Sequence, residues 1–310
     1  MDINEIIEKE LKEYMITSKE EISFQKRISN IMVSHYKNIY VPNYKKKYLF
    51  KDNFQIAYTF LKNINEEYAE LLVKRYQEGA FIVDEYVEGS KIAISNIING
   101  KPMIYFPTTN LLRDSYRIVH EFIHDTTING GYNNTRMIFC EIFSLYSELL
   151  MAKYHENQNI KEATIRSREI YSETIAAATK VKVELELMDK YLEKGFINEQ
   201  DCVSIIKSIP NRRDALAAYY VILKDEKFTF GMDQRYVIGY LLALFMLERD
   251  KNNSIEFFEL NEMLNSYSIE NLLNYLDLEL INSAGLLELS EKSYQKLEES
   301  YIKQLKKMRW

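Results

Sequence analysis

Residues that break helices are scarce in this chain. Nine glycines and four prolines are spread over 310 residues, while 46% of the residues are apolar and 28% are charged. Good helix formers such as leucine, glutamate and lysine are among the commonest of the other residues. So few interruptions favour a mainly α-helical fold. Because no internal repeat, low-complexity segment or Pro/Gly/Ser linker marks a boundary, we expect a single domain over residues 1–310.

The spacing of apolar residues places the helices along the chain. Apolar residues recur with helical periodicity over most of the sequence. This periodicity predicts helices over residues 2–15, 19–40, 52–78, 110–128, 134–155, 160–195, 212–223, 233–249, 254–265, 269–278 and 290–308. In the helix 110–128, Asn110 is expected to be the N-cap and the glycines at 130 and 131 to end it.

One stretch before that helix has strand character instead. Two runs rich in β-branched and aromatic residues, Ser90–Ile97 and Pro102–Phe106, flank the dipeptide Asn99-Gly100. An Asn-Gly pair between alternating apolar residues is a strong signal for a β-hairpin. We therefore expect a small antiparallel β-sheet within residues 80–106, beside the helix that follows it.

Charge and hydropathy exclude several classes of partner. The net charge is −6 and the basic runs are short, whereas phosphate binding needs clustered Lys and Arg, so we expect no nucleic-acid partner. No apolar stretch reaches the ~20 residues that span a bilayer, so we expect no membrane partner. The first twenty residues are acidic and amphipathic, unlike a signal peptide, and Cys140 and Cys202 form no disulfide framework. These features indicate a cytoplasmic protein.

Residues 120–124 are His-Glu-Phe-Ile-His, an H-E-x-x-H sequence in the middle of a predicted helix. A spacing of four residues puts the imidazoles of His120 and His124 on one helix face, where they can share a tetrahedral metal. Glu121 lies about 100° round the helix, from where its carboxylate can reach a water beside the metal without binding the metal itself. A five-residue match can arise by chance, so its surroundings decide its meaning.

The surroundings supply a third ligand. Glu141 lies 17 residues after His124, on the next predicted helix and beyond a loop rich in Gly and Asn. Two antiparallel helices joined in this way can bring Glu141 opposite the two histidines. Glu141 also stands in an otherwise apolar run, where an isolated carboxylate is costly unless it is paired or metal-bound. The sequence therefore predicts a zinc site with His120, His124 and Glu141 as ligands and a water in fourth place.

Glu148 is a candidate partner for one of these ligands. It lies seven residues after Glu141, on the same helix face, where it could accept a hydrogen bond from a zinc-binding imidazole. On spacing alone, a solvated surface charge is an equal alternative. His35 and His155 have no neighbours at metal-ligand spacing, and we interpret them as ordinary surface or core histidines.

The stretch Tyr105–Tyr154 resembles the zinc oligopeptidases of the thimet oligopeptidase and oligoendopeptidase F family. The family signature is an H-E-x-x-H helix followed by a helix with the pattern E-x-x-S-x-x-x-E, matched here by Glu141, Ser144 and Glu148. The approach to the motif, PTTNLLRDSYRIVHEFIH, is also similar. The resemblance extends over about residues 80–250. It implies a catalytic core there, a zincin-like helical fold, a bound Zn²⁺ and peptide substrates.

Two further segments resemble parts of this family. The sequence around Gly89 resembles the edge strand along which these enzymes hold an extended peptide, which implies Ser90, Ile92 and Ala93 as substrate-binding residues. Tyr236 lies in a segment that resembles a late helix whose tyrosines assist the transition state, which implies a catalytic Tyr236. A buried core tyrosine is the alternative there. Secondary candidates for the same role are Arg235, Tyr219 and Tyr220.

Several functions remain open on the sequence alone, because the chain is much shorter than typical family members and differs from them around Tyr236. The first is an oligoendopeptidase-like zinc peptidase, in which Glu121 is the general base. The second is a processing protease for one dedicated peptide or protein, including a toxin-like endoprotease. The third is a non-catalytic zinc-fold protein that binds or regulates a partner. The sequence does not indicate an oligomeric state.

Overall fold

The computed structural model describes residues 2–13, 26, 29–30, 32–33, 40–85, 93–98, 101–127 and 141–249. The chain divides into two compact units. Unit 1 comprises Met1–Ile39, Tyr171–Leu241 and Ile281–Trp310, and unit 2 comprises Tyr40–Ile170 and Leu242–Leu280. The expectation of one domain over the whole chain stays a prediction.

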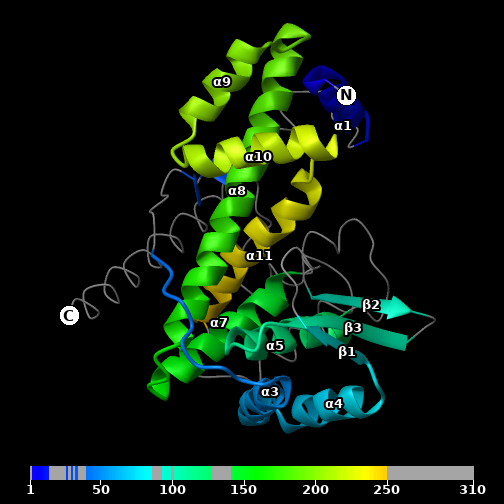
Figure 1. Ribbon diagram of the computed structural model, residues 1–310, viewed down its shortest axis with the longest axis vertical. Helices are drawn as coiled ribbons and strands as arrows, with labels where there is room; N and C mark the ends of the chain where they lie inside the picture. The colour runs from blue at the N-terminus through cyan, green and yellow to red at the C-terminus, as the bar shows by residue number, and fades with distance from the viewer. Residues whose placement is uncertain are drawn as a thin grey trace. The chain divides into compact units, whose positions relative to one another are not determined.

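Unit 2 combines a small sheet with the helices around it (Figure 1). Its elements are α3 (Phe50–Ile64), α4 (Glu66–Gln77), β1 (Phe81–Glu85), β2 (Ile94–Ile98), β3 (Lys101–Thr108), α5 (Arg113–Thr127), α7 (Glu141–Asn157) and the start of α8 (Ala163–Lys194). Unit 1 contains α1 (Ile3–Glu13), most of α8, α9 (Glu199–Ser208), α10 (Arg212–Asp225) and the first part of α11 (Phe230–Arg249). A mainly helical fold with a small sheet beside the helix that carries H-E-x-x-H is therefore confirmed.

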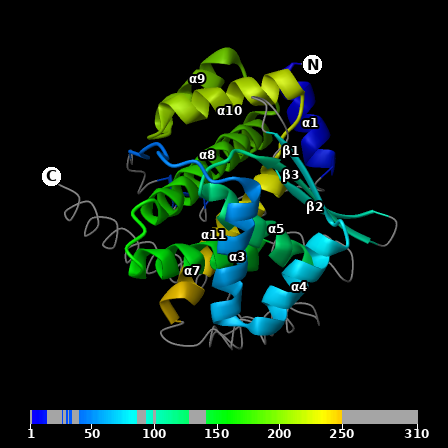
Figure 2. The ribbon, with the colours of Figure 1, turned by 60° about the horizontal axis from the view of Figure 1, so that its bottom comes forward.

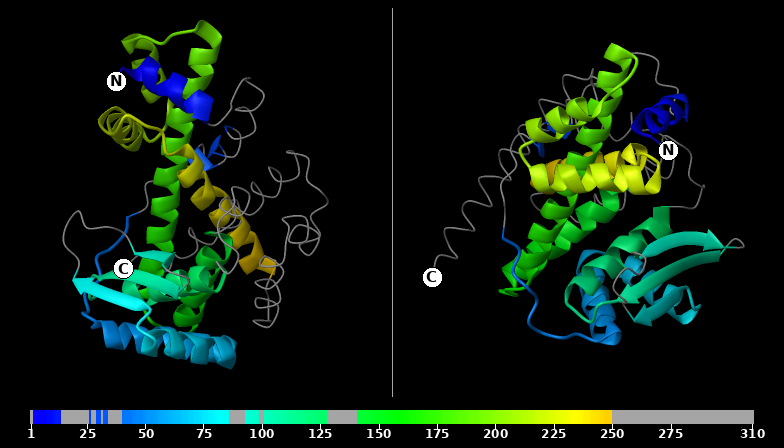
Figure 3. Two further views of the ribbon diagram at one scale, coloured as in Figure 1. Left: turned by 90° about the vertical axis from the view of Figure 1, so that its right-hand side faces the viewer. Right: turned by 45° about the horizontal axis from the view of Figure 1, so that its top comes forward.

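The sheet of unit 2 has the strand order β1-β3-β2 (Figure 3). Strands β2 and β3 are antiparallel, with Ile94 opposite Tyr105 and Ile98 opposite Lys101, as the hairpin signal predicts. The sheet as a whole is mixed, however, because β1 pairs with β3 in parallel. Strand β2 runs opposite to β3, whereas β1 and β3 run in the same direction. The prediction of a purely antiparallel sheet was therefore wrong for β1.

The helix predicted over residues 52–78 is interrupted at Asn65. Asn65 has an extended backbone, with φ −156° and ψ 122°, which ends α3. Its side-chain oxygen accepts hydrogen bonds from the backbone N–H groups of Glu67, at 2.8 Å, and Tyr68, at 3.3 Å, and so caps α4. The two helices pack against each other, and α3 also packs on α5 (Figure 2). Aromatic rings join both helices to the sheet: Phe50, Phe54, Tyr76, Phe81 and Phe106.

A buried carboxylate fastens the end of β3 to the start of α5. Asp114, which has no exposed surface, accepts hydrogen bonds from the hydroxyl groups of Thr108 (2.9 Å) and Thr109 (2.7 Å). It also accepts from the backbone N–H groups of Thr109 (2.7 Å) and Asn110 (2.9 Å). Asn110 itself has a left-handed φ of 56° and precedes the helix, so the prediction that Asn110 caps α5 was wrong. We name this set of contacts the Asp114 junction.

Helices α5 and α7 pack against each other in unit 2. Every residue of α7 from Glu141 to Leu149 is buried, so this part of the helix has no solvent face. The residues expected to be helical at 134–140 lie outside the described part of the chain. Because a buried polar group must find a partner, the carboxylates of α7 require specific neighbours on the helices around them.

Unit 1 confirms the long helix expected at 160–195, which is α8. The helices expected at 254–265, 269–278 and 290–308 lie outside the described residues, as does most of the helix expected at 19–40. None of the helices in the described ranges is both long enough and apolar enough to cross a membrane.

Glu184 is a buried carboxyl group in the core of unit 1. Its Oε1 accepts a hydrogen bond from the backbone N–H of Thr229 at 2.8 Å, while its Oε2 has no hydrogen-bond partner among the described residues. Burial raises the pKa of Glu184 to about 8, although the Thr229 N–H and the Lys180 ammonium act in the opposite direction. The folded protein therefore keeps this carboxyl protonated at neutral pH.

This shift makes the stability of the protein depend on pH. The contribution of protonated Glu184 is fully present below the ordinary pKa of 4.5 and is lost as the pH rises through about 8. Within that window the free energy of unfolding is expected to fall by about 1.4 kcal/mol per pH unit through this group. Glu184→Gln keeps an acceptor for Thr229 and removes the titration, so we expect it to flatten this slope. Thermal denaturation of both proteins across the window measures the effect, and parallel pH profiles would contradict it.

Candidate metal centre

Three side chains of unit 2 converge where α5 meets α7. Nε2 of His120 lies 3.0 Å from Nε2 of His124. Oε2 of Glu141 lies 3.3 Å from Nε2 of His120 and 3.4 Å from Nε2 of His124. The structure thus brings together all three residues that the sequence predicts as ligands. Within the described ranges, they form a cluster whose donor atoms are close enough to share one metal ion. We call these three residues the ligand cluster.

The distances within the ligand cluster fit a tetrahedral zinc ion. Zinc binds imidazole nitrogen and carboxylate oxygen at about 2.0–2.2 Å. The edge of a tetrahedron is about 1.6 times the distance from its centre to a corner, so donor atoms around zinc are about 3.3–3.6 Å apart. The observed separations of 3.0, 3.3 and 3.4 Å are close to this range. Three protein donors would leave the fourth corner open, as in catalytic rather than structural zinc sites.

The other ring nitrogen of His120 faces a second carboxylate. Nδ1 of His120 lies 2.7 Å from Oε1 of Glu148, one of the buried carboxylates of α7. A proton on Nδ1 that is donated to Glu148 leaves the lone pair of Nε2 directed at the ligand cluster, which is the tautomer a metal requires. Glu148 is only 1% exposed, so the alternative of a solvated surface charge does not hold.

Opposite charges around the ligand cluster shift the pKa values of its members. Burial by itself would lower the pKa of the His120 imidazole, but Glu141 and Glu148 outweigh burial and raise it to about 10. Burial by itself would raise the pKa of Glu141, but the two imidazoles hold it well below the usual value. For Glu148, the Arg166 guanidinium and His120 outweigh burial and bring the pKa to about 2. Both carboxyl groups therefore stay ionised, as metal coordination requires.

Glu121 follows His120 on α5 and is 6% exposed. Burial raises the pKa of Glu121 above the ordinary value of 4.5, against the opposing effect of the two imidazoles. Its carboxylate is not one of the three clustered donors. A buried carboxylate that lies beside a metal site without binding the metal can act as an acid or base towards a metal-bound water.

Comparison with known proteins identifies the fold. No protein-family model matches the sequence, and no curated protein matches it. The structure is similar to a candidate peptidase from Chlamydophila abortus, with a TM-score of 0.52 and 18% identity over 90% of this chain and 53% of that one. It is also similar to a candidate oligoendopeptidase F from Bacillus anthracis strain Ames, with a TM-score of 0.58 and 11% identity over 96% of this chain and 56% of that one.

The fold is that of these peptidase-related structures. The chain spans about half the length of both solved structures that it matches. At 11% and 18% identity the likeness concerns the course of the backbone, and the chemistry must be argued from the side chains of this chain.

The remaining predicted site residues fall in other places. Tyr236 lies on α11 in unit 1, where its hydroxyl oxygen accepts a hydrogen bond from Arg235 Nη2 at 3.1 Å. The ligand cluster belongs to unit 2, so a catalytic role for Tyr236 stays a prediction. Ala93 is buried directly before β2, while Ser90 and Ile92 lie outside the described residues. The predicted substrate-binding role of these three residues is likewise not tested.

No sequence pattern pointed to Arg166, which contacts the candidate metal centre through Glu148. Nε of Arg166 donates a hydrogen bond to Oε2 of Glu148 at 2.7 Å. Arg166 lies on α8, 18 residues after Glu148, and no motif or helical spacing connects the two positions. Only the tertiary structure brings these two side chains together.

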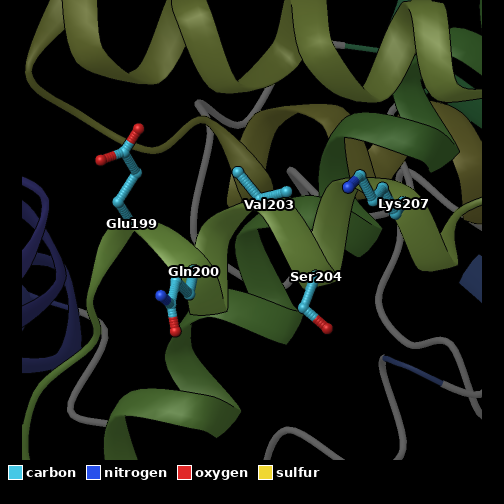
Figure 4. Close-up of a pocket in the computed structure, with 5 residues that line it drawn as sticks. All are labelled: Glu199, Gln200, Val203, Ser204 and Lys207. Carbon is cyan, nitrogen blue, oxygen red and sulfur yellow. The ribbon is translucent and has the colours of Figure 1, made fainter.

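A surface cavity of about 440 Å³ lies on unit 1 (Figure 4). Its lining residues all project from α9: Glu199, Gln200, Val203, Ser204 and Lys207. They include neither histidine nor cysteine and only one carboxylate, so they supply no set of metal ligands. Within the part of the chain that the structure describes, the side chains suited to metal binding therefore lie at the ligand cluster rather than in this cavity.

Proposed function

We propose that this chain is a zinc-dependent peptidase that hydrolyses peptide bonds in the manner of the oligoendopeptidases. The observation that carries the proposal is the triangle of donor atoms from His120, His124 and Glu141, with sides of 3.0–3.4 Å, next to a buried Glu121. The fold shared with a candidate peptidase and a candidate oligoendopeptidase F supports the same class of reaction.

In the proposed mechanism each residue has one task. Zinc, when bound, supplies the Lewis acidity that polarises the scissile carbonyl and makes a water more acidic. His120 and His124 hold the ion through Nε2, and Glu141 holds it as a carboxylate. Glu148 keeps the His120 proton on Nδ1. Glu121 takes a proton from the attacking water and delivers it to the departing amine.

The proposal is tested by metal content and peptide cleavage measured on the same preparation. We expect mass spectrometry to find one zinc per chain. A quenched fluorescent peptide should be cleaved, a chelator should stop the cleavage, and added zinc should restore it, because the three donors must be filled for Glu121 to act.

The possible outcomes separate the candidate functions. Zinc without cleavage of general peptides would favour a protease for one dedicated substrate or a non-catalytic binding protein. Carefully prepared protein that binds no zinc would contradict the proposal, as would cleavage that persists in the presence of the chelator.

A further inference from the structure

Both carboxylate oxygens of Glu148 have close partners on neighbouring helices. Oε1 lies 2.7 Å from Nδ1 of His120 on α5, and Oε2 accepts a hydrogen bond of 2.7 Å from Nε of Arg166 on α8. Glu148 is 1% exposed and Arg166 is 5% exposed, so water does not screen their attraction. A continuous chain of side-chain contacts thus runs from a predicted zinc ligand on α5 through Glu148 on α7 to Arg166 on α8.

The guanidinium of Arg166 is itself held in place from its other side. Its Nη1 donates a hydrogen bond to Oε2 of Glu169 at 3.2 Å. Glu169 also accepts a hydrogen bond from the Tyr44 hydroxyl at 2.9 Å and lies 3.6 Å from Nη1 of Arg113. A planar guanidinium fixed between two carboxylates presents its donors in one geometry, which a flexible ammonium would not do. The direction of the bond to Glu148 is therefore built into the fold of unit 2.

We propose that Arg166 is a positioning residue of the candidate metal centre: it holds the side chain of Glu148 in place, so that Glu148 fixes the ring of His120 and thereby sets the affinity for zinc. The inference rests on the proposed function in that it takes the ligand cluster to bind zinc. Without Arg166, the buried Glu148 carboxylate would lose the hydrogen bond that fixes its position, and it would turn away from His120. This change removes the acceptor that orients His120.

The same unit contains a matched ion pair that serves as a control. Nε of Arg75 on α4 donates a hydrogen bond of 2.8 Å to Oδ2 of Asp125, which is 4% exposed and follows His124 on α5. Arg75 also contacts a second carboxylate, that of Glu78, at 3.4 Å. This pair matches Arg166 with Glu148 in chemistry, distance and burial of the acid, but Asp125 pairs with Arg75 and not with a ring nitrogen of the ligand cluster. Loss of the ion pair between Arg75 and Asp125 should perturb local packing without changing the orientation of a residue in the ligand cluster.

The first test is the zinc dissociation constant, measured by competition with a chromogenic chelator. We expect Arg166→Gln to weaken zinc binding by about 10–100-fold, the range for loss of a partner of a metal ligand. Arg75→Gln should stay within about threefold of wild type, because packing alone does not set ligand orientation. Equal affinities for wild type and Arg166→Gln would overturn the inference, as would an equal loss in both variants.

A second test asks whether Arg166 acts through Glu148. If it does, then adding Arg166→Gln to Glu148→Gln should weaken zinc binding by less than about a further threefold, because the Glu148 carboxylate through which Arg166 acts is already absent. Losses that multiply in the double variant would overturn the inference. The double variant leaves no lone buried charge, so this comparison remains decisive if Arg166→Gln alone does not fold, which circular dichroism of the zinc-free proteins reports.

These measurements separate the inference from the proposed function. Wild-type protein that binds zinc but cleaves no peptide would overturn the proposed peptidase activity. The zinc affinities of the variants would still decide the role of Arg166. Wild-type protein that binds no zinc would overturn both. Unchanged affinity in Arg166→Gln, with normal cleavage in wild type, would overturn only the inference.

Discussion

Glu121→Gln is expected to reduce peptide cleavage by about 10²–10⁴-fold while the protein still binds one zinc per chain. Glutamine has the size and shape of glutamate but cannot take a proton from water. Glu121 contributes no donor to the ligand cluster, so its replacement leaves all three ligands in place. The measurement is kcat for a quenched fluorescent peptide, together with metal content, in wild type and variant.

A second buried glutamate supplies the control for this experiment. Glu184 lies in unit 1, and burial raises its pKa as it does that of Glu121. Glu184→Gln makes the same chemical change far along the sequence from the H-E-x-x-H motif, and we expect it to leave kcat unaltered. A Glu121→Gln protein that cleaves the peptide at the wild-type rate would refute the assignment of Glu121 as the general base.

His124→Ala is expected to abolish both cleavage and stable zinc binding. The structural zinc sites of small domains bind with about 10–16 kcal/mol through four ligands, which is roughly 2.5–4 kcal/mol per ligand. Removal of one ligand therefore corresponds to roughly a 100- to 1000-fold weaker affinity. Nε2 of His124 lies 3.0 and 3.4 Å from the other two donors, and alanine leaves that corner of the triangle empty. Zinc titration against a competing chelator measures the loss.

His155 provides the matched control for His124. It is a buried histidine of α7 whose Nδ1 lies 2.8 Å from the Tyr116 hydroxyl, and burial lowers its pKa to about 4. His155→Gln should keep zinc affinity within a few-fold of wild type, although it disturbs a buried hydrogen bond. If His124→Ala retained wild-type affinity, or if both variants lost zinc equally, the ligand assignment would fail.

The sequence predicted most helices of the described residues, but it joined α3 and α4 into one helix and missed the short α9. Helix α8 follows the predicted range 160–195 closely because its periodic pattern runs without glycine or proline for more than eight turns. Helix α9 was missed because its ten residues bury only Cys202 and Ile205, too few for a periodic pattern. Its capping box, formed by Asn198 and Asp201, was the available signal.

The parallel strand was missed for a different reason. β1 pairs with β3 although β2 lies between them in the sequence, so no turn sequence specifies the pairing. Its residues from Ile82 to Glu85 are exposed and lack the alternation of a half-buried strand. The hairpin of β2 and β3, in contrast, was encoded locally by the Asn-Gly signal between them.

The same distinction applies to the metal centre. The pairing of His120 with His124 follows from helix geometry, and the position of Glu141 follows from the second helix that the sequence predicts. Glu148 could be proposed because it shares a face with Glu141. Arg166 could not, because only the packing of α8 determines its partner. The part of the site that depends on local spacing was predictable, and the part that depends on tertiary packing was not.

The Asp114 junction has a consequence for the order in which unit 2 folds. Its hydrogen bonds join residues that are only four to six positions apart, so the loop that they close costs little chain entropy. Contacts at such short sequence separation are the ones that form fastest. The end of β3 and the first turn of α5 can therefore assemble as a nucleus before α7 arrives. On this view His120 and His124 are carried on a helix that is anchored early, and Glu141 joins them last.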